Sequence, residues 1–532
     1  MLPGIQVFLF LAFSCILGIG IVFLAALGAF YAARRSSWKH LKDLPGPNES
    51  VPLRWIVRQH RRIARIMHLV PYQASTLETH IGFTNLFRKE GMYRFYVGPL
   101  PNVMIFKAEL VEAVLTSQST MSKSFDYSLL HSWLGDGLLT SSGAKWKQRR
   151  RLLTPSFHFR ILDEYVAPMN EHARHMVQEI GRHTETEEIN LIPLSTSCTL
   201  GILLETIMGV EADKRDVCTR SYVGALKILS DQITLRSQTP WLLVDPIYYR
   251  TEYGKLYRKN VEVVHDFTRK VITERRKQLM SEKSASIRTN IENNEFQKKK
   301  LLTFIDILIQ QSMECDAHLT DDDIREEVDT FMFEGHDTTQ MAISWCLYLL
   351  GLYPKVQAKV HEELDEVLQK DLEKDVTMDD LKQLKYLDCV VKECQRLYPS
   401  VPFIGRTVTK EITLGGSVIP EGTNIGMIIF ALHRDPDVFP KPEEFDPDRF
   451  LPENSGSRHP FAFIPFSAGS RNCIGQRFAL MEVKIVLAHI LRSFSLRSLH
   501  QRDELMIFID LVLSSARGLK ASFSKRASSR TV

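Results

Sequence analysis

The chain has 532 residues, of which 44% are hydrophobic and 24% charged, and its formal net charge is +4 at pH 7. This is ordinary globular composition, and so small a charge gives no reason to expect a nucleic-acid partner. No Pro-, Gly- or Ser-rich linker divides the chain after residue 50, so we expect one large domain over residues 51–522 and a basic, disordered tail at 523–532. The eight cysteines contain no C-x-x-C pair, a pattern typical of a reducing compartment.

The amino terminus differs from the rest of the chain. Residues 1–33 contain no acidic or basic side chain, and the run from Ile5 to Tyr31 is almost wholly apolar. About 20 such residues cross a bilayer core, and the basic residues that follow at 34–42 stay on the cytosolic side. We therefore predict a single-pass membrane anchor at 1–33, a basic flank with a Pro-rich hinge at 34–50, and a cytosolic body.

Two other targeting segments fit the amino terminus less well. A cleaved signal peptide would begin with positive charge and have a shorter apolar run, and a mitochondrial presequence would be amphipathic and rich in Arg and Ser. The observed run has none of these features.

The body reads as mainly helical with minor strands. A long helix is predicted from Asp321 to Leu350, with Thr320 as N-cap, acidic residues in its first turn, and Gly351 and Pro354 after it. Residues 281–300 are polar and read as an exposed connection, and 433–460 as coil. The remaining expected elements are helices within 52–270 and at 356–370, 379–398 and 474–494, strands at 93–97 and 102–106, and a hairpin at 411–430.

One short motif carries the chemistry. Residues 466–475 read FSAGSRNCIG and match F-x-x-G-x-R-x-C-x-G, a match that chance would give on the order of once in ten thousand such chains. The motif resembles that of the cytochrome P450 superfamily, and the resemblance runs from the anchor to about residue 520. It implies the P450 fold, with a long helix over haem b, and Cys473 as the axial thiolate ligand of the iron.

The residue types around Cys473 suit that role. A thiolate pushes electron density to the iron to favour O–O cleavage, and backbone N–H groups at a helix start stabilise it. Gly469 and Gly475 let the backbone turn and approach the porphyrin, Phe466 shields the sulfur from water, and Arg471 is suited to a haem propionate. The alternative for Cys473, a buried free thiol, is the default for the other cysteines.

Two further motifs match the same superfamily. Glu393 and Arg396 form E-x-x-R on one helix face, and the resemblance implies that they join Arg449 in a buried charge network that locks the core. Asp448 stands where the family more often has Glu.

Trp146 and Arg150 form W-x-x-x-R and, with Arg406, are implied propionate contacts. The alternatives for Trp146 and Arg150 are a basic surface helix or a docking site for an acidic reductase.

The stretch from Glu326 to Thr339 resembles the fourth cytochrome P450 family, which includes fatty-acid ω-hydroxylases and invertebrate members. Asp337 and Thr338 occupy the positions of the acid–alcohol pair that guides protons to dioxygen, and Gly335 is expected to leave room for oxygen. Glu334 is the most specific clue, because several members of that family esterify this glutamate to a haem methyl group. The alternative is a protonated or hydrogen-bonded Glu334 without a covalent bond.

The resemblance also indicates where the substrate binds. Residues 124–140 around Trp133 and Leu134, residues 401–404 and residues 511–513 are expected to line an apolar pocket suited to a lipid chain. An apolar segment is otherwise usually core.

The expected function is a monooxygenase that hydroxylates fatty acids or related long-chain lipids at the ω position. Expected partners are O2, NADPH-cytochrome P450 reductase, cytochrome b5 as an optional second electron donor, and the endoplasmic reticulum membrane, with the protein itself a monomer. The alternatives are a broad-specificity xenobiotic oxidase, a haem-binding sensor without turnover, and an isomerase or synthase acting on peroxides. Asp337 and Thr338 argue against the last two, which need no proton relay.

Overall fold

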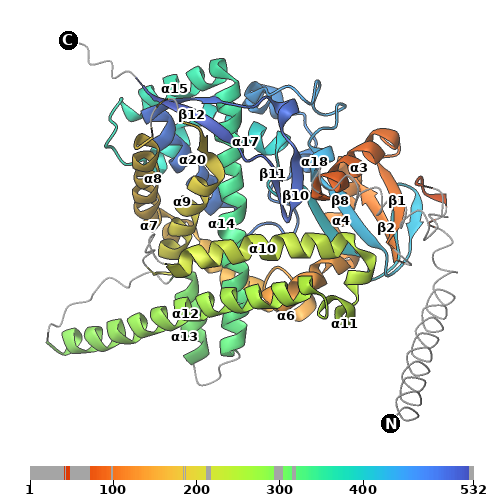
Figure 1. Cartoon of the computed structure of the whole chain (residues 1–532), viewed down its shortest axis with the longest axis horizontal. Coiled ribbons are helices and arrows are strands. Elements are labelled where there is room, and N and C mark those ends of the chain that lie inside the picture. Colours follow the sequence, from red (N-terminus) through yellow and green to blue (C-terminus); the bar gives the residue numbers. More distant parts are fainter. Residues whose placement is uncertain are drawn as a thin grey trace, which may run out of the picture.

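The computed structural model describes residues 41, 43–47, 72–97, 100–183, 185, 187–210, 217–292, 303–313 and 319–526. The fold is mainly helical with minor sheet, as predicted (Figure 1). The predicted anchor at 1–33 lies outside the described residues. Within the described part of the chain, no helix is both long and apolar enough to cross a bilayer.

A central helix organises the molecule. Helix α14, Asp321–Leu352, is 32 residues long, or about 48 Å at 1.5 Å per residue, and it crosses the whole body (Figure 1). Thr320 and Asp323 form a reciprocal capping box at its start, which satisfies backbone N–H groups that the helix itself leaves unbonded. From Gln340 onward the helix is buried up to Gly351, so its second half is core.

The other helices surround α14. Helices α8, α9 and α20 lie to one side of it, and α10 and α12 cross near its first half (Figure 1). The larger helices are α3 Tyr72–Leu86, α4 Ala108–Thr116, α6 Gly143–Leu153, α8 Val166–Gly181, α9 Leu191–Thr206, α10 Val217–Gln238, α12 Glu252–Glu292, α13 Phe304–Met313, α15 Pro354–Leu368, α17 Lys385–Leu397 and α20 Gln476–Ser493. The short ones are α5 His131–Leu134, α7 Phe159–Glu164, α11 Asp245–Tyr248, α16 Met378–Gln383, α18 Ile429–Leu432 and α19 Pro452–Ser455.

Most strands gather at one end of the molecule. The largest sheet has the order β1-β2-β8-β5-β3, in which β2 and β8 are parallel and the other pairs antiparallel. Its strands are β1 Met92–Val97, β2 Leu100–Ile105, β3 Ser122–Lys123, β5 Phe403–Thr407 and β8 Asn424–Ile428. The smaller sheets are β4-β12-β9 (Ile189–Asn190, Lys520–Lys525, Phe494–Ser498), β6-β7 (Ile412–Leu414, Ser417–Ile419) and β10-β11 (Ile507–Asp510, Val512–Ser515).

Three boundaries differ from the sequence prediction. Helix α12 continues to Glu292, into the stretch 281–300 that was expected to be a connection. Strand β12 pairs with β9 through Lys525 and buries Phe523, so the domain extends past 522 and the tail does not begin at 523. In the predicted hinge, Leu44 is buried and Pro45 accepts a hydrogen bond from the Arg94 backbone, so residues 43–47 pack on the body.

Candidate functional site

The loop before α20 holds Cys473 in a fixed turn. The Cys473 N–H donates to the Phe466 carbonyl over 2.9 Å, and Gly475 is the N-cap of α20. Gly469 has φ +72°, and a Cβ there would lie 2.3 Å from the Leu115 carbonyl oxygen, so only glycine fits. Gly475 has an ordinary φ of −89°, so its backbone conformation does not require glycine as that of Gly469 does.

The sulfur of Cys473 faces an internal space. The residue keeps accessible surface, yet it lies so deep that burial raises the pKa of its thiol to about 11. The charge of Glu334 raises this pKa further, and a hydrogen bond from the Gly475 backbone lowers it. The helix start therefore does not by itself keep Cys473 ionised; a thiolate here needs a positive partner such as a metal ion, which deprotonates a coordinating thiol.

Helix α6 braces this loop. The two terminal guanidinium nitrogens of Arg150 donate to Asn472, Nη1 to its carbonyl over 2.7 Å and Nη2 to its side-chain oxygen over 2.8 Å. These bonds hold the residue next to Cys473, and the expected contact of Arg150 with a propionate stays a prediction. The ring of Trp146 stacks on the Arg471 guanidinium, 4.7 Å from ring centroid to Cζ, so Trp146 orients that cation.

A cluster of buried cations lies beside the same space. Lys123 of β3 stands directly opposite Arg406 of β5, and both are close enough to Arg471 for mutual repulsion. Burial, and then the charges of Arg406 and Arg471, lower the pKa of Lys123 well below its ordinary value. Like charges opposite each other on paired strands destabilise a sheet. An anion bound between these cations would remove the repulsion and stabilise the arrangement.

The cluster fits the carboxylates of a haem. Arg406 is 3% exposed, and its recorded side-chain hydrogen bond goes to the Gly405 carbonyl. Arg471 donates to the Ser141 carbonyl over 2.8 Å. The carboxylate that acts on both Lys123 and Arg471 is that of Glu334. Two haem propionates would add the negative charge that neutralises the remaining cations. Sequence reasoning missed Lys123, because nothing in the local sequence indicates that it pairs with residue 406.

The middle of α14 faces Cys473 across the internal space. Glu334 lies near enough to Cys473, Lys123 and Arg471 for its charge to act on the pKa of each of them. Burial raises the pKa of Glu334 to about 7, and the charges of Lys123 and then Arg471 oppose the rise. Burial likewise raises the pKa of Asp337 to about 7. Both carboxyls can therefore exchange protons near neutral pH.

Thr338 bonds to the preceding turn of α14. Its hydroxyl donates to the Glu334 carbonyl over 2.9 Å, while its own carbonyl accepts from the Ser400 hydroxyl over 2.8 Å. A Cβ at Gly335 would lie 2.6 Å from the Leu203 side chain of α9, so the small size of Gly335 lets α9 pack closely on α14. Its expected role in leaving room for oxygen stays a prediction.

Several residues expected to line the substrate pocket belong to the core. Trp133 and Leu134 are fully buried, and the Trp133 ring lies 4.7 Å from that of Phe333. Leu513 is also fully buried. Val401, Phe403, Ile404 and Leu511 keep partial exposure, so they remain candidates.

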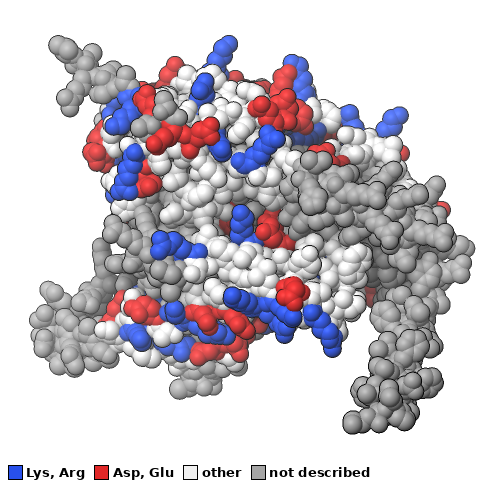
Figure 2. Space-filling model, viewed as in Figure 1, with Lys and Arg blue, Asp and Glu red and all other residues white. Residues whose placement is uncertain are grey.

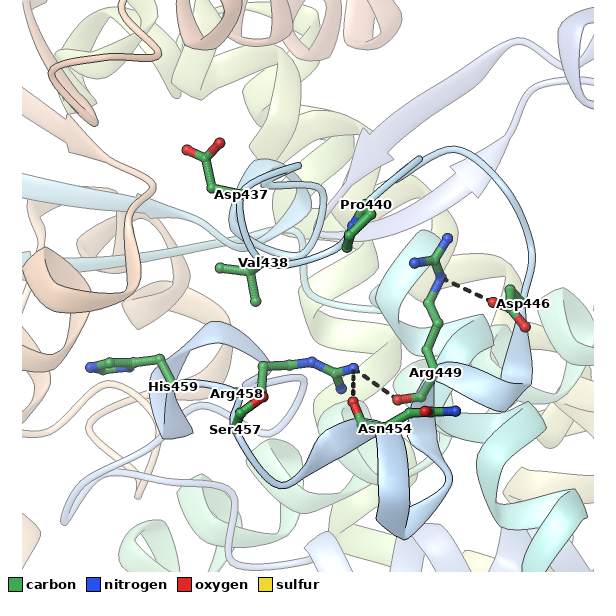
Figure 3. Close-up of a pocket in the computed structure, with 9 residues that line it drawn as sticks. All are labelled: Asp437, Val438, Pro440, Asp446, Arg449, Asn454, Ser457, Arg458 and His459. Atoms are coloured by element: carbon green, nitrogen blue, oxygen red, sulfur yellow. Dashed lines mark hydrogen bonds and ion pairs between the residues drawn. The ribbon is translucent and has the colours of Figure 1, made fainter.

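The predicted charge network is present beneath the site. Arg396 binds both carboxylate oxygens of Glu393, over 2.7 and 2.8 Å, and donates to three backbone carbonyls. Arg449 lies 3.6 Å from the Glu393 carboxylate. Figure 3 shows Arg449 and Arg458 at a polar cleft beside this network, where Arg458 donates to the carbonyls of Arg449 and Asn454. These contacts tie α17 to the coil at 433–460.

Comparison with known proteins identifies the family. A family model described as Cytochrome P450 matches residues 59–522. The chain is 41% identical over 527 residues to "Cytochrome P450 4V2" of Mus musculus, covering 99% of this chain and 98% of the relative. It is 39% identical over 512 residues to "Cytochrome P450 4c3" of Drosophila melanogaster, covering 93% of this chain and 92% of the relative. Together with the thiol, the cations and the carboxyls around one internal space, these matches establish that the chain belongs to the cytochrome P450 family, with relatives in its fourth family, and is a haem-thiolate monooxygenase.

Proposed function

We propose that this monooxygenase hydroxylates long-chain lipids, most simply fatty acids, at or near the terminal carbon. The observation that carries the proposal is Glu334, whose charge acts on the Cys473 thiol. A carboxyl that burial shifts this far is costly unless it is paired, and Lys123 and Arg471 are the cations that act on it. The relatives of the fourth family and the partly exposed apolar residues Phe403, Ile404 and Leu511 support a lipid substrate.

Cys473 would bind the iron of the haem b, with Phe466 and Gly469 shaping its loop. Arg406, Arg471 and Lys123 would hold the propionates, with Trp146 and Arg150 as further proposed contacts. The bound haem supplies dioxygen activation, with the thiolate donating electron density.

The protein's own groups move the protons. Asp337 titrates near neutral pH, so it can release a proton toward Thr338 and be recharged. The Thr338 hydroxyl can exchange its bond to the Glu334 carbonyl for one to a reacting oxygen. Replacement of Thr338 by Ala is expected to divert electrons to hydrogen peroxide.

Glu334 is proposed to form an ester with a haem methyl group. The new bond would join a carboxyl oxygen of Glu334 to the methyl carbon, and the two protons and two electrons released would reduce one hydrogen peroxide, formed by uncoupled turnover, to two waters. Such a tether would hold the haem rigidly and favour attack on a terminal methyl group over the weaker neighbouring C–H bond. Acidified solvent should then leave haem on the wild-type protein after turnover and release it from Glu334→Ala. Complete release from both would refute the ester.

The setting is also part of the proposal. Residues 1–33 are proposed to anchor the protein in the endoplasmic reticulum membrane, with the haem domain in the cytosol. NADPH-cytochrome P450 reductase is the proposed electron donor, with cytochrome b5 as an optional second donor, and the protein is proposed to act as a monomer.

Turnover with defined substrates tests the function. The purified protein, reductase and NADPH are incubated with a saturated fatty acid, a polyunsaturated fatty acid and a bulky aromatic ether, and the products are mapped by position. Terminal hydroxylation of the fatty acids supports the proposal. Turnover of the ether alone would favour the xenobiotic oxidase, and no turnover of any substrate would favour the sensor.

A further inference from the structure

Two aspartates from distant segments meet between α10 and the β10–β11 hairpin. Asp510 ends strand β10, and Asp231 and Thr234 lie on α10. The Thr234 hydroxyl donates to Asp510 Oδ1 over 3.1 Å, and the carboxyls of Asp231 and Asp510 hydrogen-bond to each other. A hydrogen bond between two carboxyls requires that one of them carry the proton, so the pair holds an exchangeable proton within the protein.

This pair lies close to the carboxyl of the oxygen-activating helix. The charge of Asp337 contributes to raising the pKa of Asp510 to about 8, after burial and the charge of Asp231. Asp337 and Asp510 both keep partial exposure, although burial is the first cause of the raised pKa of each. Each carboxyl therefore keeps a side that a water molecule can reach.

The outer end of the pair reaches the surface of α10. Burial raises the pKa of Asp231, and Lys227, which is exposed, lowers it. Lys227, Asp231 and Thr234 are spaced i, i+4, i+7 and so share one face of α10. On this face Lys227 is exposed, Asp231 is partly exposed and Thr234 is buried. Figure 2 shows this part of the molecule as largely uncharged, with a small basic and acidic group near α10.

We propose that Asp231 and Asp510 form a proton path from the surface of α10 to Asp337. In one cycle Asp510 gives a proton through an internal water to the Asp337 carboxylate, Asp231 restores the proton of Asp510 across their hydrogen bond, and bulk water restores that of Asp231. One proton enters and one leaves, and no oxidant is needed. The inference rests on the proposed function, in which Asp337 serves Thr338.

A purely structural role does not account for the chemistry of the pair. The Thr234–Asp510 bond would tie the hairpin to α10, but a neutral amide at 510 could accept the same bond. Two neighbouring carboxyls with a third nearby are destabilising in a buried setting. Groups that titrate near neutral pH suit repeated proton transfer.

The test uses the holoenzyme and compares Asp510→Asn, Asp231→Asn and Asp510→Glu. Asp503→Asn is the matched control, because Asp503 is an exposed aspartate just before the same hairpin. The Asn variants should lower kcat by roughly tenfold, below the roughly 10²-fold or more typical of a direct acid–base group. KM should stay constant and the solvent deuterium isotope effect on kcat should rise. Asp510→Glu should recover most of kcat, and Asp503→Asn should match wild type.

A second readout does not depend on turnover. In the resting enzyme, the infrared band of a protonated carboxylic acid should disappear as pH rises through about 8, and Asp510→Asn should lack it. Absence of this band from wild type would overturn the proposal.

The outcomes separate this proposal from the one beneath it. Unchanged kcat and isotope effect in both Asn variants, with Asp337→Asn impaired, would overturn the path alone. An unimpaired Asp337→Asn would remove the relay itself. A change confined to KM would overturn the path and assign the pair to substrate binding.

Discussion

Replacement of Lys123 by Met is expected to weaken haem retention and to stabilise the haem-free protein. Lys123 lies opposite Arg406 across β3 and β5, with Arg471 nearby. Met keeps a long unbranched side chain that can still cover the Tyr127 ring, over which the Lys123 ammonium lies at 4.2 Å. The substitution thus removes the charge and preserves most of the packing.

The magnitudes follow from two opposing terms. Like charges facing each other on paired strands cost roughly 0.2–1 kcal/mol, and this cost disappears from the haem-free state of the variant. A hydrogen bond to a charged group contributes about 1.5–3 kcal/mol, and the variant loses one such bond to a propionate. At about 1.4 kcal/mol per factor of ten, haem should bind roughly ten- to a hundredfold more weakly.

The assay is haem transfer from the holoenzyme to excess apomyoglobin, followed by denaturant unfolding of the haem-stripped protein. Lys147→Met is the control, because Lys147 lies exposed on α6. Two results together would refute the reasoning that the cations bind an anion. The variant would transfer haem as slowly as wild type, and its haem-stripped form would unfold at a lower denaturant midpoint than that of wild type.

Other changes probe the remaining parts of the site. Cys473→Ala should abolish the thiolate-type absorbance of the reduced carbon monoxide complex, and a spectrum like that of wild type would refute the ligand assignment. Arg396→Met should lower the free energy of unfolding by about 3–5 kcal/mol, because it leaves the Glu393 carboxylate buried without its partner; a denaturant midpoint equal to wild type would contradict this. Gly469→Ala should reduce the yield of haem-loaded protein, since its Cβ would meet the Leu115 carbonyl, and normal loading would show that the loop can move.

Local signals predicted much of this molecule. Thr320 as N-cap and the acidic first turn predicted the start of α14, and the Cys473 motif located the loop before α20. The E-x-x-R spacing predicted the buried pair of Glu393 and Arg396, because i, i+3 residues share a helix face.

The features that were missed depend on contacts between distant segments. Lys123 faces Arg406 only through the pairing of β3 with β5. Gly335 is small because α9 brings Leu203 against α14. Arg150 donates to the carbonyl and the side-chain amide oxygen of Asn472. The W-x-x-x-R motif gives no indication of this contact, because Asn472 lies far along the chain.

Helix α6 links the two faces of the site through neighbouring side chains. Arg150 holds Asn472 beside the cysteine, and Arg149 pairs with Asp323 and lies 3.6 Å from Glu327, both on α14. A rigid shift of α6 therefore displaces the cysteine loop and α14 together. The site then behaves as a mechanical unit in which one short helix sets the spacing, so a force applied to the exposed side of that helix moves both faces and keeps the separation of the two faces between which the haem is proposed to lie.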